Sequence, residues 1–172
     1  ASMTCRQPFS TRPWLRSRQQ DKAEHGCGNL PVTVKPNQLG MAELARRIGA
    51  GQMTAEEAMR SCLQRIALRE SAVGAFVSID EAAALEAARA ADRSVELSGV
   101  SGPLHGVPIG VKDIIDTRQF ATGWGTSFYQ DHQPGRNASC VELFLQAGAI
   151  IVGKTVTTEF AYFKPGKTAN PH

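Results

Sequence analysis

Apolar residues recur at helical spacing in three stretches of the first hundred residues. They predict a short helix within residues 38–48, a longer helix over residues 55–69 and an alanine-rich helix over residues 81–93. The residues that set the spacing are Leu44 and Ile48 in the first helix and Met59, Cys62, Leu63 and Ile66 in the second. Thr54 and Glu57 have the spacing of a capping box, so the second helix is expected to begin directly after Thr54.

The pattern changes to short apolar runs further along the chain. Strands are predicted over residues 75–79, 109–115 and 149–152. A helix is predicted between the last two strands, beginning near Ser139, where Glu142 repeats the spacing of a capping box. A strand, a loop, a helix and a strand in succession resemble a β-α-β unit, which favours an α/β fold.

The remaining segments show neither the helical spacing nor the strand-like apolar runs, and they are expected to be irregular. Loops are predicted over residues 94–102, 117–137 and 154–172. Residues 1–36 mix Pro, Arg, Ser, Gln and Gly and predict a poorly ordered leader, whose opening Ala-Ser-Met-Thr resembles a vector-encoded tag. Residues 37–172 are therefore expected to be the folded part, which is long enough for one domain with a core or for part of a larger domain.

One charged amine interrupts the apolar strand predicted over residues 109–115. Val107, Ile109 and Val111 alternate with Lys112, so a period of two places the ammonium on the face opposite these three aliphatic side chains. An amine held against a sheet loses hydration, which disfavours its charged form and lowers its pKa. Spacing alone favours an ordinary lysine that ends a strand, and desolvation would make Lys112 a candidate base.

Composition and charge narrow the function classes. Hydrophobic residues make up 42% of the 172 residues and charged residues 20%, which is typical of a soluble globular protein. The net charge of +3 comes from residues 1–35, which carry a balance of +4, so the remainder is near −1. We therefore expect no nucleic-acid interface on the folded part, no membrane span and a cytoplasmic location. The four scattered cysteines lack the pairing typical of zinc or redox sites and are expected to be free thiols.

One segment matches the consensus sequence of a phosphate-binding loop, but its predicted structure does not suit such a loop. Residues 148–155, Gly-Ala-Ile-Ile-Val-Gly-Lys-Thr, satisfy GxxxxGK[ST]. The middle residues of such a loop must curl around an anion, whereas here they form the predicted apolar strand. Nucleotide binding is thus a minor hypothesis, and Lys154 and Thr155 are expected to end a strand.

Other polar and aromatic residues are weaker candidates. Asp113, Asp116 and Glu159 lie near the predicted strand ends, where they are expected to be turn acceptors or surface charges. The alternative is that they position Lys112 or a loop N–H group. His105 is expected to be a hydrogen-bonded loop residue, with the lining of a pocket as the alternative. Trp124 and Tyr129 are expected to pack, and the alternative is a pocket wall.

Three segments together resemble the N-terminal part of the amidase signature family. They are Gly102-Pro-Leu-His-Gly-Val-Pro-Ile-Gly-Val-Lys-Asp-Ile-Ile-Asp-Thr117, the stretch from Ala147 to Ala161, and Thr168-Ala-Asn-Pro-His172. The resemblance spans roughly residues 38–172. It implies an α/β fold in which helices flank a large mixed sheet, and hydrolysis of carboxylic amides by a Ser, cis-Ser, Lys triad without a metal or an organic cofactor.

The resemblance assigns the triad lysine to Lys112, as the neutral base that acts on the cis-serine. It also implies that both serines lie beyond an Asn-Pro segment like that at 170–171, so the 172-residue chain is expected to be truncated and inactive alone. A non-catalytic fragment or binding module is one alternative. Another is the tRNA-dependent amidotransferase subunit of the same family, although residues 158–167 look more like hydrolases of small amides. The partner implied is a small-molecule amide; a homo-oligomer is an open option.

Overall fold

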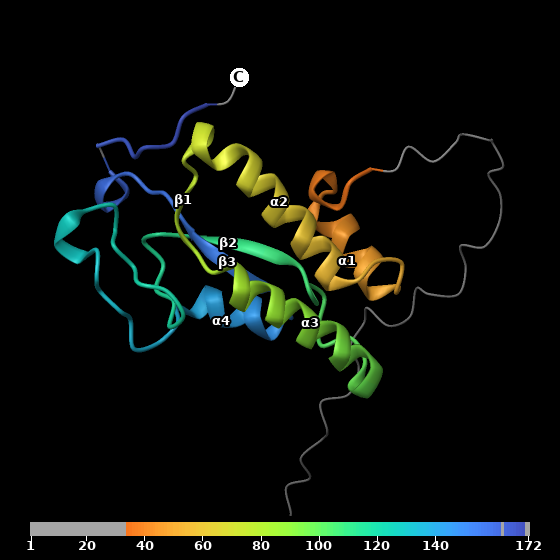
Figure 1. The fold of residues 1–172 in the computed structure, drawn as a ribbon. Helices are drawn as coiled ribbons and strands as arrows, with labels where there is room; N and C mark the ends of the chain where they lie inside the picture. Colours follow the sequence, from red (N-terminus) through yellow and green to blue (C-terminus); the bar gives the residue numbers. More distant parts are fainter. Residues whose placement is uncertain (1–33, 163, 171–172) are drawn as a thin grey trace, which may run out of the picture. The chain divides into compact units, whose positions relative to one another are not determined.

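The computed structural model describes residues 34–162 and 164–170, and most of the predicted leader, residues 1–33, lies outside the described residues. Within the part Val34–His172, helices flank a three-stranded mixed sheet, which confirms the predicted α/β class (Figure 1). The connecting segments of the described residues include the short 3₁₀ helices η2 (Pro36–Gln38), η3 (Ser127–Tyr129) and η4 (Glu159–Ala161).

Three helices pack against one face of the sheet and form the first core with it. They are α1 (Met41–Gly49), α2 (Ala55–Val73) and α3 (Glu81–Ser98), and α2 and α3 run side by side (Figure 1). Alanines on both helices are fully buried, which lets the two backbones approach closely. The buried residues of this core are Leu44, Ile48, Ala55, Ala58, Met59, Leu63, Ala84, Ala88, Val107, Ile150 and Val152.

The sheet has the order β1-β3-β2, with β1 at Phe76–Ile79, β2 at Pro108–Lys112 and β3 at Ile150–Thr155. β1 is antiparallel to β3, whereas β2 and β3 are parallel neighbours. α4 (Ser139–Gln146) connects β2 with β3, so the predicted β-α-β unit is confirmed. Val141 of α4 packs in a second core with Val111, Phe120 and Ile151.

An irregularity in β3 changes which side chains share a face. Ile109 pairs with Ile151 and Gly110 pairs with Gly153, so β3 has one extra residue at this point. As a result Lys154 lies opposite Val111 in the register, although simple alternation would group it with Ile150 and Val152. The bulge thus aims the side chain of Lys154 toward the loop that follows β2.

Several predicted boundaries are wrong by a few residues. β2 ends at Lys112, not at residue 115, because the Ile115 N–H turns back to the Lys112 carbonyl at 2.9 Å. Val107 precedes the strand and packs in the first core, so it does not share a face with Ile109 and Val111. α3 continues to Ser98, through the first half of the loop predicted over 94–102.

The capping box predicted at Ser139 is also wrong. Ala138 is the N-cap residue of α4, and Ser139 is already helical. The Glu142 carboxylate accepts a hydrogen bond from Asn137 Nδ2 at 2.7 Å, and Asn137 Oδ1 accepts one from the Arg118 N–H. A neighbouring amide therefore occupies the carboxylate that a capping box would use.

Three side chains accept hydrogen bonds at the start of α2. The Thr54 hydroxyl accepts the Glu57 N–H at 3.0 Å and Glu57 accepts the Thr54 N–H in return, so this predicted capping box is confirmed. Asp92 of α3 accepts the N–H groups of Ala55 at 2.7 Å and Glu56 at 3.0 Å. A carboxylate from α3 thus satisfies free N–H groups at the positive N-terminal end of α2.

Replacing Asp92 with alanine should destabilise the packing of α2 on α3. The two N–H groups would lose their acceptor, which costs about 1–2 kcal/mol by analogy with the loss of an N-cap. Urea unfolding of Asp92→Ala measures this loss, with Asp92→Asn as the matched variant because one amide oxygen remains as an acceptor. Equal stability of wild type and Asp92→Ala would contradict the assignment of a cap.

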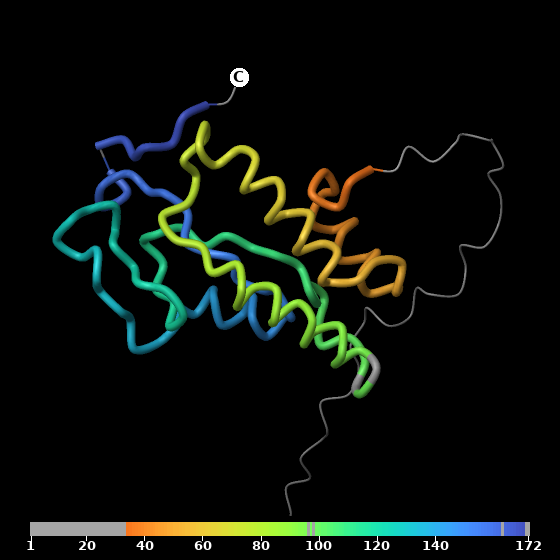
Figure 2. The backbone as a smooth tube through the Cα atoms, viewed as in Figure 1, coloured from red at the N-terminus to blue at the C-terminus, as the bar shows by residue number. Residues whose placement is uncertain are grey.

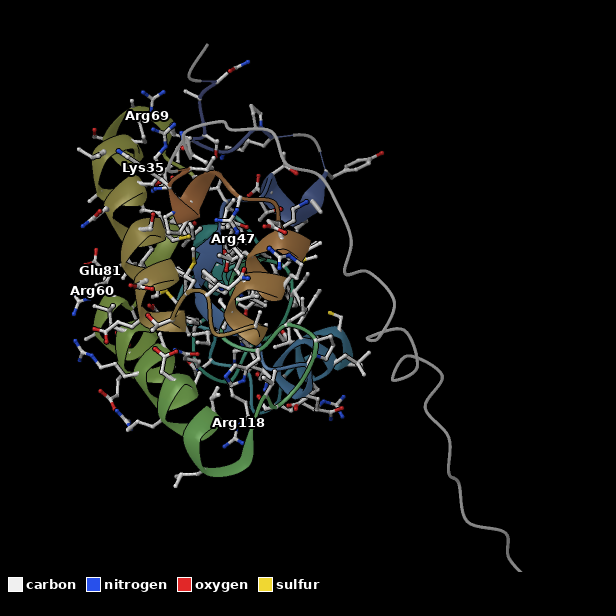
Figure 3. All side chains as sticks on the ribbon, turned by 90° about the vertical axis from the view of Figure 1, so that its right-hand side faces the viewer. Lys35, Arg47, Arg60, Arg69, Glu81 and Arg118 are labelled. Carbon is white, nitrogen blue, oxygen red and sulfur yellow. The ribbon has the colours of Figure 1, made fainter. Side chains whose placement is uncertain are left out.

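The charged side chains of α1 predict a pH effect. Hydrogen bonds from Arg46 and then from Arg47 lower the pKa of Glu43 from its ordinary 4.5 to about 2; Figure 3 labels Arg47 on the helix surface. The unfolded chain therefore binds more protons between pH 4.5 and pH 2, so this pair stabilises the fold above that window and the contribution is lost on acidification. As the pH is lowered through this window, the melting temperature of Glu43→Gln should fall less steeply than that of the wild type. Parallel plots of melting temperature against pH for the two proteins would contradict the pairing.

In the described part of the chain, no helix combines the length and the apolar character needed to cross a membrane.

Candidate active site

Lys112 is the last residue of β2, which lies at one edge of the sheet. In the register it pairs with Thr155 of β3, and its side chain is exposed. The desolvation predicted for this amine is therefore wrong for the described chain. The reason is its position, because an edge strand ends here and the backbone turns away directly after it.

Asp113 follows Lys112 and is buried, with only 2% of its surface exposed. Its backbone N–H donates to the Thr155 carbonyl at 2.9 Å, and its own carbonyl accepts the Trp124 N–H at 2.8 Å. Its carboxylate accepts the Gly123 N–H at 3.1 Å. Of the roles expected for this acid, the holding of a loop N–H group is the one that the structure shows.

A buried lysine lies beside Asp113. Lys154 of β3 has no exposed surface, and its ammonium donates to the Ile115 carbonyl at 2.7 Å and to the Thr122 hydroxyl at 2.6 Å. It also forms an ion pair with Asp113 Oδ1 at 3.8 Å. Burial lowers the pKa of Lys154, and the charges of Asp113 and Asp116 act in the opposite direction.

The sequence analysis did not predict that Lys154 is a buried lysine paired with Asp113. It did predict that Lys154 and Thr155 end a strand, and β3, which includes both, confirms this. The backbone of the phosphate-loop motif is an extended strand here, and the lysine is buried among protein acceptors. A usable signal was a lysine that directly follows a run of fully buried strand residues, because such a cation needs partners inside the protein.

His105 serves the fold. Its Nδ1 lies 2.7 Å from the Ser101 hydroxyl and its Nε2 lies 3.1 Å from the Ala91 carbonyl. The carbonyl can only accept, so Nε2 carries the proton and Nδ1 accepts from the serine. The buried ring therefore ties the loop before β2 to α3, as expected of a hydrogen-bonded loop histidine.

Aromatic rings gather where the loop after β2 meets the segment after β3. The rings of Trp124 and Tyr129 lie 4.7 Å apart, and Phe160 lies 6.3 Å from Trp124. The Phe160 N–H donates to the Trp124 carbonyl at 2.9 Å, and Figure 2 shows the two segments side by side. The cluster thus joins the two segments that follow Lys112 and Lys154.

A hollow of about 270 Å³ lies on the α4 side of the sheet, lined by Arg118, Gln119, Asn137, Leu145 and Ile151. Lys112 does not line it. Among the residues that the structure describes, no three His, Cys, Asp or Glu side chains gather in a way that would hold a metal ion. Among the described residues, the end of β2, where the exposed Lys112 adjoins a buried polar network, is therefore the candidate site.

Comparison with known protein families accounts for most of the chain. Residues 57–171 match the family model described as Amidase, and they include the end of β2, the Lys154 network and α4. The chain belongs to the amidase family.

The relatives include proteins named as amidases and proteins named as amidotransferase subunits. The putative amidase AmiD of Mycobacterium tuberculosis (strain ATCC 25618 / H37Rv) is 38% identical over 126 residues, which cover 73% of this chain and 26% of that protein. A glutamyl-tRNA(Gln) amidotransferase subunit from Myxococcus xanthus is 41% identical over 123 residues, 72% of this chain and 25% of that protein. The chain spans about a quarter of the length of these curated relatives.

A solved structure shows the same fold. The native peptide amidase of Stenotrophomonas maltophilia superposes with a TM-score of 0.66 and 31% sequence identity, over 74% of this chain and 26% of that enzyme. The arrangement of helices and mixed sheet described above is thus the one that amidase relatives share.

Proposed function

We propose that the protein that contains this segment hydrolyses a carboxylic amide, and that Lys112 is its general base. The family membership of residues 57–171 supports the reaction class. The observation that carries the residue assignment is that Lys112 stands exposed at the carboxyl end of β2, on backbone that a buried network holds in place.

The proposed reaction divides amide cleavage into two steps. The Lys112 amine accepts a proton from the cis-serine, which takes one from the nucleophilic serine as that oxygen attacks the amide carbon. The proton passes back to the leaving nitrogen, the C–N bond breaks and an acyl-serine remains. Water then attacks the acyl carbon while the cis-serine and Lys112 accept one of its protons. The C–O bond to the serine breaks, the proton returns to the serine oxygen, and the acid is released as its carboxylate. The two serines are assigned to the three quarters of the relatives' length that this chain does not match.

The reaction class is tested with the full-length protein and a panel of primary and secondary amides. The proposal expects carboxylate and ammonia or amine to be released in equal amounts, without added metal or organic cofactor. Absence of turnover on every amide in the panel, by protein that is folded, would overturn the proposal.

The amidotransferase subunit is the second candidate, favoured by the 41% identity to the Myxococcus xanthus protein. The two candidates differ in where the ammonia goes. A hydrolase releases ammonia from glutamine or another amide into solution, whereas an amidotransferase subunit passes it to a partner's acyl substrate. Turnover of a simple amide by the protein alone, at a rate that added partner subunits do not raise, would favour the hydrolase.

A further inference from the structure

We infer that Lys154 is a positioning residue for the reaction: its buried ammonium fixes the backbone after β2 and thereby the placement of Lys112. This inference rests on the proposed function of Lys112. It adds a role for a second lysine that never touches the substrate, and the contacts of that lysine carry it.

The Lys154 ammonium is engaged by protein groups through two hydrogen bonds and one ion pair. An ammonium carries three N–H donors, and three acceptors surround it: the Ile115 carbonyl at 2.7 Å, the Thr122 hydroxyl at 2.6 Å and Asp113 Oδ1 at 3.8 Å. The side chain is fully buried in protein. It is therefore neither a free base nor a site for a phosphate group, and its partners define what it does.

These partners all lie on the loop that leaves the end of β2. Asp113 is bonded directly to Lys112 in the chain, Ile115 closes the turn on the Lys112 carbonyl, and Thr122 lies where the loop returns. One cation on β3 thus holds three points of this loop. The Asp113 N–H bond to Thr155 adds a fourth tie between the loop and β3.

The anchored backbone leaves Lys112 little freedom at its Cα. Its own carbonyl accepts the Ile115 N–H, and the next residue is held at its N–H, its carbonyl and its carboxylate. Alternation along β2 directs the Lys112 side chain away from the face that Lys154 and Val111 share. The network therefore acts on the base through the backbone, without direct contact.

The test uses Lys154→Met in the full-length protein, since methionine keeps an unbranched chain but has no donors. We expect kcat to fall by about 10–100-fold while KM changes less than about threefold, because a small displacement of a catalytic group slows the chemical step. Lys154→Met also leaves the Asp113 carboxylate buried without its cation, which destabilises the fold. The double variant Lys154→Met with Asp113→Asn removes that unpaired charge, and it should regain stability without regaining kcat.

Two comparisons separate positioning from stability. Leu63→Ala removes a buried side chain from the helical core, away from the loop, and should lower the melting temperature while kcat stays within about twofold of wild type. Lys154→Met introduced into Lys112→Ala should cause no further fall, because a residue that acts only through Lys112 has nothing left to position. A p-nitrophenyl ester is the substrate for this cycle, since its leaving group needs no proton and the residual rate stays measurable.

Each outcome decides the inference. An undiminished kcat in the stable double variant, or an equal fall in the wild-type and Lys112→Ala backgrounds, would overturn the positioning role. Retained amide turnover in Lys112→Ala alone would instead overturn the proposed base. Because the Lys154 network is intact in that variant, this outcome is distinct from a failure of the positioning role.

Discussion

Lys112→Ala in the full-length protein is expected to lower kcat/KM for amide hydrolysis by about 10²–10⁴-fold, the usual contribution of a positioned acid or base. The melting temperature should stay unchanged, because the Lys112 side chain is exposed and the ties at the end of β2 come from the backbone and from Asp113. Initial rates on the best amide of the panel, with thermal melts of the same samples, check both expectations.

Lys164→Ala provides the matched control for this variant. Lys164 is also an exposed lysine on this chain, 76% accessible in its side chain, and its contact with Glu159 is long, at 3.9 Å. Its loss should leave kcat/KM within about twofold, as is usual for a surface change. Similar rates for Lys112→Ala and Lys164→Ala would contradict the assignment of Lys112 as the base.

Gly106→Ala should lower the free energy of unfolding by about 2–5 kcal/mol, although it adds only one methyl group. Gly106 precedes β2 and has a φ of +73°, a conformation that costs an alanine about 1–2 kcal/mol. A Cβ at this position would also lie 2.5 Å from the Ala55 Cβ, at the fully buried start of α2. The methyl group would push apart the first core and the strand that carries Lys112.

Denaturant unfolding of Gly106→Ala is compared with Gly49→Ala at the end of α1. Gly49 is exposed, and a Cβ there would meet no atom within 4 Å. Alanine favours helix over glycine, so Gly49→Ala should be neutral or raise stability by about 0.5–1 kcal/mol. If the two variants unfold at the same denaturant concentration, the close packing of the β2 entry on α2 is refuted.

Local patterns predicted the elements that local forces decide. The Thr54 capping box marked the start of α2, and the apolar run after Gly148 marked β3. Boundaries failed where distant contacts decide them. β2 stops at Lys112, where the Ile115 N–H turns back to the Lys112 carbonyl. Contacts of Asp113 with Gly123 and Lys154 hold this turn, and neither partner is close in the sequence.

The sequence pointed to the candidate residue but not to its environment. The motif around Lys112 and its resemblance to the family led to this amine, and the expected desolvation was assigned to the wrong lysine. A bulge in β3 is what places Lys154 opposite Val111 and buries it, and strict alternation cannot reveal an extra residue. Sequence spacing therefore found the exposed lysine, and only the fold revealed the buried one beside it.

The central claim is that Lys112 activates a serine, and the reactivity of that serine reports on it directly. The measurement is the rate at which a fluorophosphonate probe labels the full-length protein, compared between wild type and Lys112→Ala at equal fold content. The account predicts labelling of the wild type and labelling at least about 100-fold slower in the variant. Equal labelling rates would show that the serine is activated without Lys112 and would contradict the account.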